Sequence, residues 1–154
     1  MADLGTRTAT TGDLEVLREL YRRSSLSNEG DRANLLASLE VLVWPGDGVA
    51  AGHTRVATDG DERILGFATV VRVEGGLELE DLFVDPEAMR QGVATRLVLD
   101  AVSRAASEGV PWIEVTANRH AAEFYASVGF VPVGETQTLF GLAPRLRRDV
   151  NLAD

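Results

Sequence analysis

The sequence predicts an α/β (α+β) protein built on a mixed, mostly antiparallel sheet of six or seven strands, with helices on both faces and a broadly sequential strand order. Short runs rich in β-branched and aromatic residues, joined by glycine-containing turns, favour an antiparallel meander in the middle of the chain. A long amphipathic helical pattern follows the strand expected at 77–84. Another strand, 112–116, comes after that helix, and a crossover through a helix makes the two strands parallel.

Length and composition indicate one soluble domain spanning 1–154. A chain of 154 residues can bury a sizeable core, and 45% hydrophobic with 25% charged residues is ordinary for a globular protein. No apolar run approaches the length of a membrane span, and the start of the sequence lacks a basic region followed by an apolar one. We therefore expect a cytoplasmic protein with no membrane partner.

Charge and cysteine usage exclude several classes of function. A net charge of −9 argues against a nucleic-acid partner, for which a basic surface would be expected. It is compatible with a cationic or amine substrate, although acidic composition more often serves solubility. The absence of cysteine removes disulfides, thiolate metal sites and a cysteine nucleophile. His53 and His120 are too isolated to suggest zinc, so we expect no metal.

The N-terminal part of the chain predicts one strand and two helices. The strand covers 6–10, and Thr10 or Thr11 caps a helix whose first turn is acidic and whose end is basic, as the helix dipole favours. A second helix is predicted over 28–43, where leucines recur at helical spacing, and Pro45 helps to end it.

The next part of the chain predicts the meander. Strands are expected at 49–58, 63–73 and 77–84, and Asp59-Gly60 has the composition of a hairpin turn between the first two. Glutamate and two glycines at 74–76 make the following turn. Short turns join antiparallel neighbours, so these three strands are expected to pair in sequence.

The end of the chain predicts a closing pair of strands at 130–134 and 136–142. The segment from about 145 onwards is basic and then acidic, and we expect it to be loosely ordered.

Between residues 78 and 100 the sequence predicts a strand, a sharp turn and a helix with no long loop between them. Asp85-Pro86 closes the strand, and apolar residues recur at helical spacing from Val93 onwards. The intervening loop carries a basic residue, Arg90, and a central Gly92. Such a loop at a helix N-terminus points unpaired backbone N–H groups at one anion, for which phosphate is the natural guest. A plain structural corner with a glycine explains this stretch equally well when it is considered alone.

A second stretch, 118–130, follows the strand at 112–116 and predicts a short helix ended by Gly129. Together the two stretches resemble the GCN5-related N-acetyltransferase (GNAT) family. The first is similar to its signature Q/R-x-x-G-x-G/A and the second to its pattern N-x-x-A-x-x-F-Y-x-x-x-G-F. The matching residues are Gly92 and Ala94 in the first, and Asn118, Ala121, Phe124, Tyr125, Gly129 and Phe130 in the second.

The resemblance implies acetyl-coenzyme A as co-substrate and one acyl-coenzyme A N-acyltransferase domain. It also implies that the strands holding Val84 and Val115 splay apart, as the fourth and fifth of the sheet, to admit the thioester. Met89 departs from the family's Gln or Arg, which removes a side-chain contribution but leaves the backbone N–H groups in place. The residues expected to bind the cofactor are Leu82, Phe83, Val84, Arg90, Gln91, Gly92, Val93, Ala94, Thr95, Asn118 and Tyr125.

The resemblance also implies catalytic roles. Tyr125 would protonate the coenzyme A thiolate, and the backbone N–H of Val84 would bind the oxyanion. Glu80 is the first candidate for the general base and Glu78 the second, with Asp81 on the opposite face also open. An acid between apolar neighbours has a raised pKa, which helps a base at neutral pH. Each acid could equally be an exposed strand residue, and Tyr125 a core aromatic.

We expect an N-acetyltransferase that transfers acetyl directly to a primary amine of a small molecule or peptide. The alternatives are a non-catalytic acyl-coenzyme A binding or sensor module and an interaction domain without a cofactor. The acceptor and the acyl-chain preference stay open, and a homodimer is the oligomer that general frequency favours. In the resembled fold the acceptor pocket borders the first two helices, which makes candidate contacts of Tyr21, Ser24, Ser27, Asn28 and Trp44.

Overall fold

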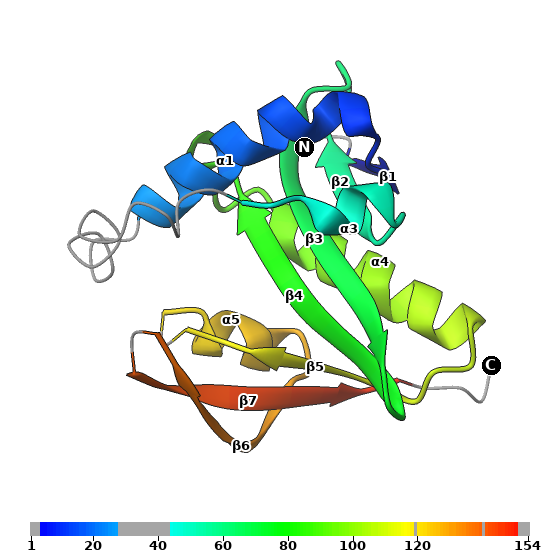
Figure 1. The fold of residues 1–154 in the computed structure, drawn as a ribbon, viewed down its shortest axis with the longest axis vertical. Coiled ribbons are helices and arrows are strands. Elements are labelled where there is room, and N and C mark those ends of the chain that lie inside the picture. Colours follow the sequence, from blue (N-terminus) through cyan, green and yellow to red (C-terminus); the bar gives the residue numbers. More distant parts are fainter. Residues whose placement is uncertain (1–3, 28–43, 119, 140, 151–154) are drawn as a thin grey trace. The chain divides into compact units, whose positions relative to one another are not determined.

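The computed structural model describes residues 4–27, 44–118, 120–139 and 141–150 (Figure 1). They form a seven-stranded sheet in the order β1-β2-β3-β4-β5-β7-β6, which confirms the predicted mixed sheet. The predicted helix at 28–43 lies outside the described residues. In chain order the elements are β1 (Gly5–Thr8), η1 (Thr11–Asp13), α1 (Leu14–Leu26), α3 (Asp47–Ala50), β2 (Thr54–Thr58), β3 (Ile64–Val73), β4 (Gly76–Val84), η3 (Pro86–Ala88), α4 (Val93–Ser107), β5 (Trp112–Thr116), α5 (Ala122–Ser127), β6 (Val131–Thr138) and β7 (Gly141–Asp149).

The chain divides into two compact units, and the first combines residues 1–69 with 81–97. Its β2 and β3, the first two strands of the predicted meander, pair antiparallel as expected, and β1 adds a further antiparallel strand beside β2. α1 buries Leu17 and Leu20 in a core cluster that also contains Trp44 and Phe67. A capping box starts η1, the short helix directly ahead of α1, and in it the Asp13 carboxylate accepts the backbone N–H of Thr10 at 2.8 Å.

The prediction of a strand over 49–58 is wrong for the first half of that range. Residues 47–50 form the short helix α3, and β2 begins only at Thr54. The backbone N–H of Val49 donates to the Gly46 carbonyl and that of His53 to the Gly48 carbonyl, so the chain turns on itself here. Val49 is buried, but a single buried valine fits a helical turn as well as a strand.

The second unit combines residues 70–80 with 98–154. β4 and β5 pair in parallel, as predicted, over only three residue pairs, from Leu77 opposite Ile113 to Leu79 opposite Val115. β4 continues to Val84 after this pairing ends, as expected of a sheet that splays between these two strands. The expectation of one domain over 1–154 stays a prediction.

The C-terminal strands differ from the prediction. β6 extends to Thr138 and β7 begins at Gly141, so the predicted break near 135 is absent. The segment from 145 is not loosely ordered, because residues 145–149 complete β7 and pair with β5 from Thr116 opposite Arg145 to Trp112 opposite Asp149. β7 lies between β5 and β6, so the last two strands exchange their sequential order (Figure 1). Its alternating arginines meet glutamates and Trp112 on β4 and β5, and this cross-strand pairing stabilises a segment that composition alone describes as polar.

Candidate active site

Asp85 fixes the connection between β4 and α4 in the first unit. One carboxylate oxygen accepts the backbone N–H of Glu87 at 3.0 Å, which starts η3. The other accepts a hydrogen bond from Arg23 Nη2 on α1 at 2.6 Å, and the Asp85 N–H donates to the Leu65 carbonyl at 2.8 Å. Asp85 therefore anchors the loop that follows to α1 through its buried carboxylate and to β3 through its backbone N–H.

The loop from Arg90 to Thr95 has the geometry of an anion cradle. Arg90 and Gly92 adopt left-handed φ angles of 64° and 82°, and α4 begins directly afterwards at Val93. The Arg96 N–H bonds to the Gly92 carbonyl at 2.9 Å, so the amides of 93–95 belong to the first turn and have no acceptor within the helix. A left-handed φ at a residue other than glycine costs free energy and is typical of functional loops.

The surroundings of Gly92 fit a pyrophosphate. A Cβ atom added to Gly92 would meet no protein atom within 4 Å, so the space beside the helix N-terminus is open. Successive backbone N–H groups around left-handed residues form concavities that bind anions, and the dipole of α4 adds to the attraction. Met89 is exposed, as is Arg90. The loop thus provides backbone donors without depending on the side chain at 89.

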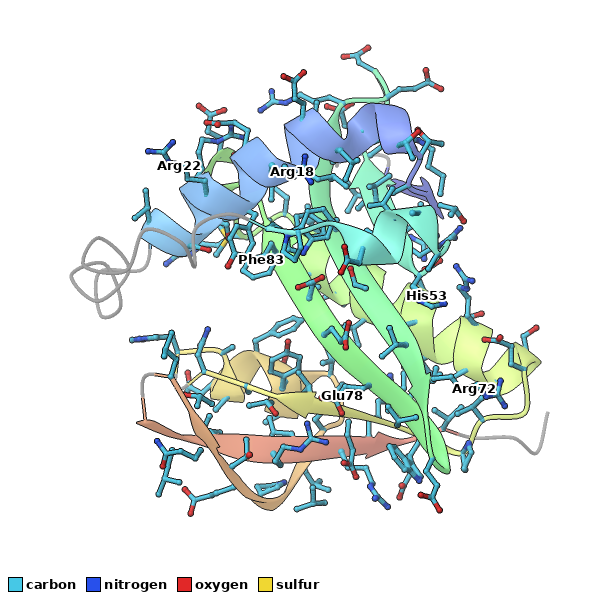
Figure 2. The ribbon with its side chains drawn as sticks, in the orientation of Figure 1. Arg18, Arg22, His53, Arg72, Glu78 and Phe83 are labelled. Carbon is cyan, nitrogen blue, oxygen red and sulfur yellow. The ribbon has the colours of Figure 1, made fainter. Side chains whose placement is uncertain are left out.

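The three acidic residues of β4 have different surroundings. Glu78 accepts two hydrogen bonds from Arg145, at 2.6 and 2.9 Å, and extends from β4 as Figure 2 shows. Glu80 is exposed. Asp81 is half-buried and accepts a hydrogen bond from Trp44 Nε1 at 3.0 Å. Burial raises the pKa of Asp81, and hydrogen bonds from Thr69 and Trp44 oppose that rise in part.

Asp81 is therefore the acid of β4 whose surroundings raise its pKa, as the sequence analysis expects of a general base among apolar neighbours. The sequence leaves Asp81 open as a candidate base and ranks Glu80 and Glu78 ahead of it. No sequence signal links it to Trp44, because the two are 37 residues apart and meet only through the fold. The same holds for the Glu78 pair, since Arg145 fell in a segment expected to lack order.

Tyr125 lies on α5 in the second unit, with its ring between Phe124 and Phe130 at centroid distances of 5.2 Å in both cases. Burial raises the pKa of Tyr125, so the phenol stays protonated at neutral pH and can donate a proton. Asn118 uses Oδ1 to accept the Ala121 N–H at 2.8 Å, which shapes the turn into α5. Its amide NH₂ is not used in that bond.

The predicted site residues divide between the two units. The first holds the cradle, 90–95, and the end of β4, where Leu82, Phe83 and Val84 are half-buried. The second holds Glu78, Glu80, Asn118 and Tyr125. Among the described residues no group of three or more His, Cys, Asp or Glu side chains could hold a metal ion, and no helix is long and apolar enough to cross a membrane.

Fold and loop together define an acyl-coenzyme A-dependent transferase. Residues 48–143, more than half of the chain, match the family described as the acetyltransferase (GNAT) domain. The chain therefore belongs to the GNAT acetyltransferase family. It is an N-acetyltransferase whose acetyl donor is acetyl-coenzyme A, as the two motifs predicted.

Solved structures share this fold at low sequence identity. The PaiA N-acetyltransferase from Thermoplasma acidophilum, in complex with coenzyme A, is 19% identical with a TM-score of 0.74 over 96% of this chain and 99% of that one. The ribosomal-protein-S18-alanine N-acetyltransferase from Escherichia coli is 20% identical with a TM-score of 0.71 over 99% and 97%. N-acetylglutamate synthase from Neisseria gonorrhoeae, with coenzyme A and N-acetyl-glutamate, is 18% identical with a TM-score of 0.72 over 98% of this chain and 36% of that one. A search of curated protein sequences gives no match.

Proposed function

We propose that the protein transfers the acetyl group directly to a primary amine of a small molecule or peptide. The observation that carries the cofactor half of this proposal is the cradle, in which two left-handed residues precede the N-terminus of α4. The resemblance of 118–130 to the family pattern carries the rest, because it includes Tyr125 at the position of the family's acid. Among the similar structures, one enzyme is named for an alanine of ribosomal protein S18 and another was solved with N-acetyl-glutamate, so a protein residue and a small amino acid are both compatible with the fold.

The proposed chemistry divides among the residues of this chain. Backbone N–H groups of 90–95 bind the pyrophosphate, and the Val84 N–H stabilises the oxyanion that develops at the thioester carbonyl. Glu80 accepts the proton that the amine loses, directly or through water, because its exposed carboxylate is accessible to solvent. Tyr125 gives a proton to the departing thiolate. Glu78 is a weaker candidate for the base, since its two oxygens are engaged by Arg145.

The cradle is tested by isothermal titration with acetyl-coenzyme A. Gly92→Glu places a carboxylate where the phosphates would bind, and we expect the affinity to fall at least 100-fold. Gly109→Glu is a matched control, because Gly109 has a left-handed φ of 72° and equally open surroundings but lies outside the loop. Equal affinity in both variants would contradict the assignment of the cradle.

A non-catalytic binding module is the second candidate, and Met89 favours it because a side-chain contact of the family signature is missing. The two are separated by measuring free thiol with a panel of amines. Release that depends on an added amine supports transfer. Tight binding of acetyl-coenzyme A without such release would support the binding module.

A further inference from the structure

A cavity of about 680 Å³ lies within the first unit. Its lining comes from β1, η1, α1, the turn before β3, and η3. Pockets that bind small molecules have volumes of roughly 300 to 1,000 Å³, so this cavity is large enough for such a ligand. None of the residues expected to bind the cofactor, to act as the base or to contact the acceptor lines it. The cavity is therefore a separate candidate site.

The turn before β3 brings a strained residue to this cavity. The Asp59 carboxylate accepts the backbone N–H groups of Asp61 and Arg63, at 2.9 and 3.0 Å. The Glu62 N–H donates to the Asp59 carbonyl at 3.0 Å, and Glu62 has a left-handed φ of 64°. This conformation is unfavourable for glutamate, where glycine would adopt it freely. Non-glycine residues held in this way occur most often at functional sites, which directs attention to the Glu62 side chain.

Glu62 and Arg63 bring opposite charges to the lining from consecutive positions. Both side chains are exposed, and within the described part of the chain the Glu62 carboxylate has no hydrogen bond and no ion pair. Arg63 uses only Nη2 there, which lies 3.1 Å from Glu87 and 4.0 Å from Asp85. A carboxylate and a guanidinium on neighbouring residues suit a ligand whose own two charges lie close together.

The remaining charges of the lining are already paired. Arg7 bonds to Asp13 at 2.9 Å, and Arg23 bonds to Asp85 at 2.6 Å. A ligand that engaged these groups would compete with short ion pairs to nearly buried carboxylates. Glu62 and the unused donors of Arg63, by contrast, can engage a ligand without breaking an ion pair.

Apolar side chains form another part of the lining. Val16 on α1 is 50% exposed, although Leu17 and Leu20 of the same helix are fully buried. Ile64 and Pro86 line the same cavity. An apolar group placed against Val16 would remove this surface from water, which is favourable. The cavity thus combines an apolar contact with two opposite charges.

We propose that this cavity binds an α-amino acid with an apolar side chain, at a site separate from that of the acceptor. Its carboxylate accepts hydrogen bonds from the unused donors of Arg63, its ammonium group donates to Glu62, and its side chain contacts Val16. A zwitterion has no net charge, so the net charge of −9 on the protein, which disfavours a simple anion, does not oppose its binding. The inference does not depend on the proposed acetyl transfer.

Isothermal titration with L-leucine in the absence of acetyl-coenzyme A tests the site. We expect saturable binding that is weakened about tenfold by Glu62→Gln and by Arg63→Met, because each variant removes a charged hydrogen-bond partner. Asp61→Asn and Arg22→Met are matched controls and should leave the affinity unchanged. Each removes one exposed charge of the same unit that does not line the cavity, and Figure 2 shows Arg22 on α1.

Leucine analogues test the same contacts on the unmodified protein. 4-Methylpentanoate lacks the ammonium group and 3-methylbutylamine lacks the carboxylate, so each should bind about tenfold more weakly than leucine. The inference is overturned if leucine does not bind, if either analogue binds as tightly as leucine, or if Glu62→Gln and Arg63→Met keep the wild-type affinity. Thiol release driven by leucine, with a KM that rises in Glu62→Gln, would also overturn it, because the cavity would then be the acceptor site.

Glu62→Gly gives a result that a purely structural turn residue would not. Glycine adopts the left-handed φ without strain, so the melting temperature should rise. The affinity for leucine should nevertheless fall about tenfold, because the carboxylate is lost. A higher melting temperature with unchanged leucine affinity would remove Glu62 from the site and overturn the proposal of a zwitterionic ligand.

Discussion

Arg145 on β7 donates two hydrogen bonds to Glu78 on β4, at 2.6 and 2.9 Å, and a third to Glu114 on β5 at 2.7 Å. One guanidinium therefore bridges two carboxylates from neighbouring strands, and Arg147 supplies a second positive charge to Glu114. Both acids are more than three-quarters buried, so the pair is screened less than a surface ion pair. Such two-point contacts with arginine are among the stronger charged hydrogen bonds.

This relationship predicts that Glu78 acts mainly on stability. Glu78→Gln should lower the free energy of unfolding by about 1 kcal/mol, and Arg145→Met by about 2 kcal/mol, because it leaves Glu78 unpaired and Glu114 with Arg147 alone. Urea denaturation measures both. Glu80→Gln is the comparison, since we expect it to lower kcat about 100-fold with little change in stability. A large loss of kcat in Glu78→Gln alone would show that Glu78, and not Glu80, is the general base.

Tyr125→Phe should lower kcat about 100-fold while the melting temperature changes little, because the ring keeps its contacts with Phe124 and Phe130. Burial raises the pKa of Tyr125, so the phenol remains a donor throughout an assay from pH 6 to 9. Any fall in rate with rising pH in that range should therefore be the same in wild type and variant. A kcat that equals that of the wild type would remove Tyr125 from the mechanism.

Asp81→Asn should raise the melting temperature at pH 7. The pKa of Asp81 is higher in the folded than in the unfolded state, so its contribution to stability is present below the unfolded pKa and is lost as the pH rises through the folded pKa. At pH 7 the ionised group thus opposes folding, and the variant should gain more stability there than at pH 4. Calorimetric scans at both pH values check this. A variant less stable than the wild type at pH 7 would show that the carboxylate is a structural element.

The lowered pKa of Asp13 predicts that stability depends on pH in the opposite sense. A hydrogen bond from Arg7 lowers the pKa of Asp13 to about 2, so its contribution to stability is present above the unfolded pKa and is lost as the pH falls toward 2. Asp13→Ala also removes the capping box ahead of α1 and should cost about 1 kcal/mol at pH 7. The difference from wild type in urea denaturation should shrink below pH 4. A constant difference would mean that the ion pair contributes nothing beyond the cap.

Local signals in the sequence were sufficient for the elements around the cofactor loop. β5 has the predicted bounds, Trp112–Thr116, and α4 begins at Val93 as the apolar spacing indicated. These features depend on neighbouring residues, which a sequence displays directly. The contacts of Asp81 with Trp44 and of Glu78 with Arg145 depend on strand order and register instead, and no spacing along the chain encodes them. For the same reason α3 was missed, because a single buried Val49 has no period.

The position of β7 between β5 and β6 has a consequence for how the chain is made on the ribosome. β7 follows both β5 and β6 in the chain, yet it is the strand that joins these two. Until residues 141–149 have emerged, β5 exposes a row of unpaired backbone groups to other nascent chains. Such open edges promote aggregation, and the long sequence separation of these pairings slows their closure. We therefore expect a chain truncated before Gly141 to aggregate or to be retained by chaperones instead of folding into a shorter active enzyme.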